Sequence, residues 1–166
     1  PFAVSSSQCK EVRLAAERAG RCVGANHNIS FTGAYRRLLG AVQTRRLGQV
    51  EHVAVVFHAP LRQLAAGQHG HWIFRETGNI MLELGPHLMS TLYPLVGAVR
   101  KASTVVSGPR PLSNGSIFYD TWQSSLLCER GTAQVLLSVG RDNNEQTLHA
   151  IGQDGAAFVD LRRNTL

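Results

Sequence analysis

The sequence predicts an α+β fold in which an open, mostly antiparallel (mixed) sheet carries helices on one face. Its 166 residues, 43% hydrophobic and 17% charged, suit one ordinary globular domain. Apolar residues recur at helical spacing in several segments before residue 97, whereas the later part alternates with a period of two between turn-forming residues. This alternation of apolar and polar positions implies a sheet whose other face is open.

The first helix is predicted directly after Ser5, a suitable N-cap that has Gln8 three residues later. Gly20 supplies its C-terminal stop. Residues 21–25 form a short candidate strand. The first 25 residues therefore predict one helix leading into one strand, a pair that cannot close a core alone.

A second helix is predicted to start at Ser30 or Thr32 and to stop before Gly48. Arg45 and Arg46 are placed in its last turn, where the helix dipole favours cations. The apolar stripe of this helix is formed by Tyr35, Leu38, Leu39 and Val42.

Residues 49–59 are rich in Val and alternate, which predicts a strand. Residues 60–75 have no sustained period and predict a long irregular loop, a kind of segment that is often functional. Residues 79–96 predict an apolar helix. Pro86 lies inside it and should bend it, because proline lacks the N–H that would bond to the carbonyl of Leu82.

The rest of the chain predicts a meander of strands near 101–106, 117–128, 133–139, 146–151 and 156–161. Turn-forming residues indicate hairpin-type connections at 129–131, 142–144 and 154–155. The mildly apolar open face of the predicted sheet is a candidate interface between subunits.

Composition argues against several function classes. The net charge is +6, but the cations are scattered with only three Arg doublets, whereas nucleic-acid binding usually shows a clustered basic footprint. The three Cys form no C-x-x-C pair and no even set, which favours a reducing, cytoplasmic location over a disulfide framework. We find neither a signal peptide nor an apolar stretch of membrane-spanning length.

Glu83 and His87 are the leading candidates for chemistry. They are four residues apart, so a helix presents both on one face, where a carboxylate can orient an imidazole that works as a general acid or base. An ordinary surface ion pair remains an alternative. A metal site built from His69, His71, His87 and Glu83 has no defined zinc spacing and is disfavoured. The other four His are interpreted as surface residues of strands or loops, and no G-x-G-x-x-G or Walker-type loop is found.

Residues 78–87, followed by Leu95-Val96-Gly97, resemble the Gly-Gly-x-x-x-Asp-x-Gly-x-His helix of the Gfo/Idh/MocA family of NAD(P)-dependent oxidoreductases. Glu83 stands where that family usually has Asp, Asn79 replaces the second Gly, and Ser90 stands where many members carry a further Asp. Residues 24–28 resemble the family's crossover between its two domains, and residues 46–50 resemble its entry into the large sheet.

The resemblance implies that the sheet is preceded by the last helix and strand of a Rossmann domain, residues 1–26, and that residues 27–166 form the C-terminal substrate-binding and oligomerisation domain. The chain would then be a fragment, truncated at its end, that lacks the Gly-rich fingerprint and the family's catalytic Lys. We expect it to bind NAD or NADP poorly and to show no turnover alone.

In the parent protein, the resemblance implies hydride transfer between a hydroxyl compound, such as a sugar or polyol, and a nicotinamide, NAD or NADP. His87 would carry the proton and Glu83 would orient it. Asn26 is a candidate cofactor contact. The candidate substrate contacts are Trp72, Arg75, Asn79 and Ser90. The alternatives are a non-catalytic dimerisation module and, third, a basic nucleic-acid-binding module. We expect a homo-oligomer with no nucleic acid, membrane or metal partner.

Overall fold

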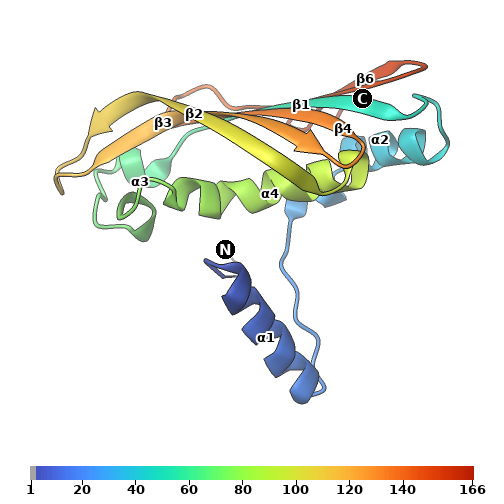
Figure 1. Ribbon diagram of the computed structural model, residues 1–166. Coiled ribbons are helices and arrows are strands. Elements are labelled where there is room, and N and C mark those ends of the chain that lie inside the picture. The colour runs from blue at the N-terminus through green and yellow to red at the C-terminus, as the bar shows by residue number, and fades with distance from the viewer. Residues whose placement is uncertain (1–2) are drawn as a thin grey trace.

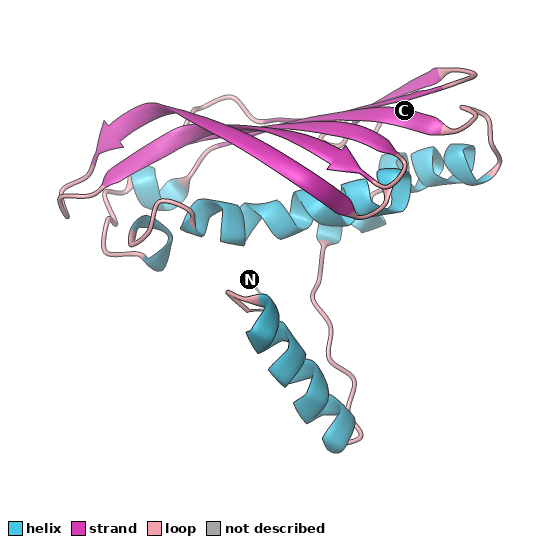
Figure 2. Ribbon diagram, in the orientation of Figure 1, coloured by secondary structure: helices cyan, strands magenta, loops and turns pink. Residues whose placement is uncertain are grey.

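The computed structural model describes residues 3–166 and shows one sheet with helices on one of its faces (Figures 1 and 2). The helices are α1 (Ser6–Arg18), α2 (Gly33–Gln43), α3 (Arg62–Ala65) and α4 (Asn79–Val96), with short 3-10 helices η1 (Asn28–Phe31) and η2 (Trp72–Phe74). The strands are β1 (Val50–Ala59), β2 (Val99–Pro111), β3 (Ile117–Cys128), β4 (Gly131–Val139), β5 (Glu145–Gly152) and β6 (Ala156–Asp160).

The six strands follow the order β2-β3-β4-β1-β5-β6. The pair β1 and β4 is parallel and every other pair is antiparallel, which confirms the predicted mixed sheet. The prediction of an uninterrupted meander was wrong, because β1 lies between β4 and β5. Residues 142–144 therefore connect β4 to β5 across β1 and do not form a hairpin, whereas the turns at 129–130 and 152–155 do join neighbouring strands.

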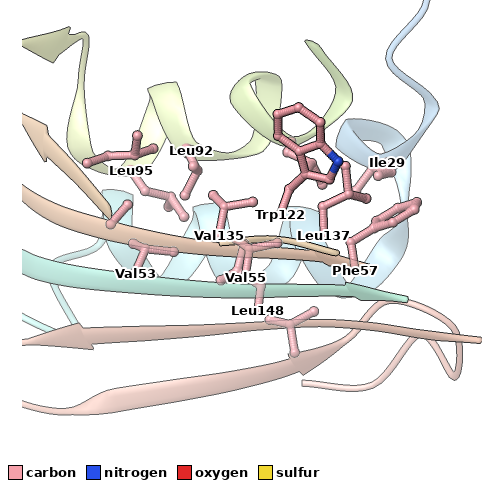
Figure 3. Packing of buried hydrophobic residues seen from close by; sticks show 14 of the residues in the cluster. Ile29, Val53, Val55, Phe57, Leu92, Leu95, Trp122, Val135, Leu137 and Leu148 are labelled. Carbon is pink, nitrogen blue, oxygen red and sulfur yellow. The ribbon is translucent and has the colours of Figure 1, made fainter. Parts of the chain in front are cut away.

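The hydrophobic core lies between the sheet and the helices (Figure 3). In β3, buried and exposed residues alternate along nearly the whole strand, so Trp122 and Leu126 face the helices. In β1 the same face carries Val53 and Val55, and α4 contributes Leu92. Burial of one face per strand is the feature that positions α4 along the sheet.

The long loop predicted at 60–75 is partly ordered into α3 and η2. The helix predicted over 79–96 is confirmed as α4, which continues through both Pro86 and Pro94. None of the helices in the described range is long and apolar enough to cross a membrane.

Two local predictions were wrong. Residues 21–25 form no strand: they run as an exposed, extended connection from α1 to η1, and no described strand lies beside them to share hydrogen bonds (Figure 1). Arg45 and Arg46 lie beyond the end of α2, which stops at Gln43. Arg45 has a φ of 55°, and the N–H of Arg46 bonds back to the carbonyl of Ala41, a helix-terminating turn that the sequence pattern did not indicate.

Candidate functional site

A cavity of about 380 Å³ opens beside the middle of α4. Glu83 and His87 both line it. Their spacing of four residues puts them on the same side of the helix. Its remaining lining residues come from the segment before α1, from α1, from the extended connection after it and from α4: Ala3, Cys9, Ala25, Asn26, His27 and Pro86. The cavity thus joins three segments that are distant in sequence.

The local sequence of α4 explains how the two side chains reach the cavity. α4 begins at Asn79, whose Nδ2 donates a hydrogen bond of 2.8 Å to the carbonyl of Trp72 and so connects α4 to η2. Ile80 and Leu88 are fully buried and face the sheet. Glu83 and His87 are displaced around the helix from that buried stripe, so both can be partly exposed at the cavity.

His87 is surrounded so that its neutral form is favoured. Burial lowers the pKa of His87, and the nearby His27 lowers this pKa further, while the carboxylate of Glu83 acts in the opposite sense and raises it. The Nδ1 atom of His87 is buried and makes no hydrogen bond to any described residue. His87 can therefore present an uncharged imidazole to a ligand in the cavity.

His27 is the site residue that the sequence reasoning missed. It was interpreted as a surface histidine, but it lines the cavity. Its Nδ1 is buried and makes no hydrogen bond to any residue in 3–166. Its ring meets that of His87 in a T-shaped contact, with centroids 5.3 Å apart and planes at 88°. The one sequence signal that could have indicated its place in the cavity is that His27 lies within residues 24–28, the segment that resembles the family's crossover between domains. Periodicity could not have indicated it, because an extended connection has no buried face that repeats.

Ser90 lies one turn after His87. Its Oγ donates to the carbonyl of His87 at 2.7 Å and lies 3.4 Å from the Oγ of Ser30. Ser90 therefore holds α4 against η1 and does not line the cavity. Asn26 does line it, which places the candidate cofactor contact beside His27.

Trp72, Arg75 and Asn79 lie away from this cavity. Trp72 packs partly buried against the core and is bonded to Asn79 through its carbonyl. Arg75 lines a separate depression formed with residues 116–119 of the sheet. Their role as substrate contacts stays a prediction.

The histidines weighed as metal ligands are separated from His87. The Nδ1 of His69 lies 2.8 Å from the Oγ of Ser113, and the Nδ1 of His71 accepts from the N–H of Ile73 at the start of η2. Neither lines the cavity at α4. Within residues 3–166, no three His, Cys, Asp or Glu side chains are grouped to hold a metal ion.

The arrangement can exchange a proton with a hydroxyl group. A neutral imidazole accepts the proton, and a carboxylate one helical turn away stabilises the imidazolium that results. Among the described residues that line the cavity there is no Lys or Arg. Its chemistry therefore suits an uncharged, hydrogen-bonding ligand more than an anion.

Comparison with solved structures identifies the fold. The chain is similar to an oxidoreductase from Agrobacterium radiobacter in complex with NAD+, L-tartaric acid and magnesium, at 15% identity and a TM-score of 0.75, over 97% of this chain and 52% of that one. It is also similar to scyllo-inositol dehydrogenase from Lactobacillus casei with bound NAD(H) and scyllo-inositol, at 14% identity and a TM-score of 0.72, over 89% and 44%. A myo-inositol dehydrogenase from Corynebacterium glutamicum matches at 18% identity and a TM-score of 0.66, over 91% and 45%.

The chain has the fold of the C-terminal domain of such dehydrogenases. It spans about half the length of the structures that it matches. The resemblance to the Gfo/Idh/MocA family is thereby supported at the level of the fold. No family model and no curated protein matches the sequence.

Proposed function

We propose that this chain is the C-terminal, substrate-binding part of an NAD(P)-dependent oxidoreductase that acts on a CH–OH group of a sugar, polyol or related compound. The observation that carries this proposal is the cavity at α4, where Glu83 and His87 meet on a fold shared with dehydrogenases. A catalytic pair in a cavity is more specific than the fold, because one fold can host many functions.

In this proposal, His87 accepts the proton of the substrate hydroxyl and Glu83 stabilises the charge that His87 gains. Burial and His27 keep the pKa of His87 below its usual value, so the ring is uncharged and ready to accept at neutral pH. A bound nicotinamide would supply the hydride acceptor. This part of the protein does not provide a phosphate cradle for it, because the sequence has no G-x-G-x-x-G loop.

We assign residues 1–26 to the end of a dinucleotide-binding domain and residues 27–166 to the substrate domain. α1 supports this division, because none of its residues is buried although Cys9, Val12 and Ala16 share one side of it. An isolated helix of 13 residues is marginal in water, so α1 is expected to pack against further protein. Asn26 would contact the cofactor where the two parts meet.

We keep Trp72, Arg75, Asn79 and Ser90 as proposed substrate residues of the full-length protein, although none of the four lines the cavity at α4. Because Ser90 bonds to the backbone of His87, its contribution is to fix the turn of α4 that carries the imidazole. Asn79 fixes η2 against the start of α4 in the same way. We place the protein in the cytoplasm, since Cys9, Cys22 and Cys128 are all free thiols.

The test is turnover of the full-length protein with NAD+ or NADP+ and a panel of inositols and sugars, followed as nicotinamide absorbance. His87→Gln should lower kcat by about 100-fold or more, the usual contribution of a general base. His69→Gln is the matched control, because His69 pairs with the side chain of Ser113 and does not line the cavity. Full activity of His87→Gln would overturn the assignment. This chain alone is expected to show no turnover.

A second function, assembly, is favoured by the sheet face that no helix covers. Val105, Leu127 and Phe158 lie on this face, and 68%, 52% and 58% of their respective surfaces are exposed. Exposed apolar groups of this size on one sheet face are typical of an interface. We propose that two copies of the chain associate through it, with or without catalysis.

A further inference from the structure

His27 and His87 face each other across the same cavity from two different segments. His87 belongs to α4, and His27 ends the extended connection directly before η1. Their rings form a T-shaped contact at 5.3 Å, a geometry in which the edge of one ring meets the face of the other. The two side chains therefore restrain each other's orientation.

We propose that His27 is a positioning residue for His87, which holds the His87 ring at the cavity wall with a nitrogen available to accept a proton from a ligand hydroxyl. This inference rests on the proposed function for the identity of that ligand. The ring contact itself does not depend on it, because both residues belong to the described chain.

The lack of a hydrogen-bond partner at one ring nitrogen of His87 supports the proposal. A catalytic histidine is usually oriented by a hydrogen bond from one ring nitrogen to a carboxylate or carbonyl. The buried Nδ1 of His87 makes no such bond with the described residues, and neither does that of His27. The T-shaped packing against His27 is therefore a contact that orients the His87 ring.

The surrounding structure keeps His27 in place. η1 starts at the residue after His27, and its Ser30 lies 3.4 Å from Ser90 of α4, Oγ to Oγ. Ser90 in turn donates to the carbonyl of His87 at 2.7 Å. The two serines therefore connect the segment that carries His27 to the helical turn that carries His87.

The charges at the cavity act in the direction that the proposal requires. Among the described residues, the titratable groups that line it are Cys9 of α1, His27 of the connection, and Glu83 and His87 of α4. Burial lowers the pKa of His87 most, His27 lowers it next, and Glu83 raises it. Removal of His27 should therefore raise the pKa of His87.

The test uses this chain and the pH titration of its histidine ring signals by NMR, with the His87 signal assigned through a His87→Gln variant. In His27→Phe, which keeps an aromatic ring but removes the charge, the pKa of His87 should rise by more than the error of the fit. The matched control His69→Gln, at a histidine that pairs with Ser113 outside the cavity, should leave the His87 curve unchanged.

An unchanged His87 curve in His27→Phe would overturn the proposal. If that variant does not fold, as judged by circular dichroism, His27→Gln is used instead, and an unchanged His87 curve in it also overturns the proposal. In the full-length protein, His27→Phe should move the acid limb of the kcat/KM profile to higher pH. If the NMR shift occurs but His87→Gln keeps full turnover, the proposed function fails and the positioning role stands.

Discussion

The hydroxyl of Tyr35 donates a hydrogen bond of 2.7 Å to the backbone carbonyl of Thr91. Both residues are buried, so this bond joins α2 to the middle of α4 inside the core. It fixes the same stretch of α4 that carries His87 one turn earlier. The position of the candidate site on α4 thus depends on a contact that takes no part in its chemistry.

Tyr35→Phe should lower the free energy of unfolding by about 1 kcal/mol, because it removes this hydrogen bond and keeps the packing of the ring. Urea unfolding followed by circular dichroism measures the change. Tyr93→Phe is the matched control, since Tyr93 is 63% exposed and its loss of a hydroxyl should have no effect. Equal stability of the Tyr35→Phe variant and the unchanged chain would show that the bond contributes nothing.

Tyr35 also predicts a stability loss at alkaline pH. Burial raises the pKa of Tyr35 in the folded state, whereas the unfolded chain ionises near the ordinary value of about 10. The unfolded state then loses its proton first, so stability is complete below about pH 10 and falls as the pH rises above it. Unfolding free energies measured on both sides of pH 10 should fall more steeply for the unchanged chain than for Tyr35→Phe. Parallel curves would contradict this.

Gly131 is expected to be intolerant of any side chain. Its φ is 128°, and a Cβ atom there would lie 2.3 Å from the carbonyl oxygen of Glu51, which is rigid backbone. Gly131→Ala should therefore destabilise the fold by about 3 kcal/mol or more. Gly115→Ala is the control with backbone strain alone, since the φ of Gly115 is 84° and a Cβ added there would have no atom within 4 Å apart from its chain neighbours. This control should lower the free energy of unfolding by about 1 to 2 kcal/mol. Similar losses in the two variants would argue against the close approach.

The open sheet face predicts an oligomer that charge can disrupt. The double variant Val105→Glu, Leu127→Glu should shift the mass measured by light scattering from a multiple of the chain to that of a monomer, because burial of two carboxylates in an apolar interface is unfavourable. Tyr93→Glu places the same charge on an exposed position of α4, outside this face, and should leave the mass unchanged. A monomeric mass for the unchanged chain would refute the proposed interface.

The sequence predicted the elements more accurately than their connections. Helix α4 and strand β3 were recovered because their burial has a period that the residues display, as the alternation around Trp122 shows. The insertion of β1 between β4 and β5 has no such signal, since the choice of neighbours in a sheet depends on contacts distant in sequence. The end of α2 was misplaced because Arg45 adopts a positive φ that is uncommon for a residue other than glycine.

The candidate site was predicted in part for the same reason. Glu83 and His87 lie on one helix, so their spacing alone places them together. His27 could not be found in this way, because its approach to His87 is set by the path of the connection between α1 and η1. Trp72 and Arg75 were grouped with the site through a loop whose conformation the residues do not determine.

The place of β1 in the sheet has a consequence for how the chain reaches its native state. β1 is made well before its partners, Thr132–Val139 and Glu145–Gly152, emerge during synthesis. Until they do, a Val-rich strand has two unpaired edges, which is a recognised hazard for aggregation. Pairings between such distant segments also favour slow folding. The pairing of β1 at the centre of the sheet is therefore the folding step before which a nascent chain most needs protection from aggregation.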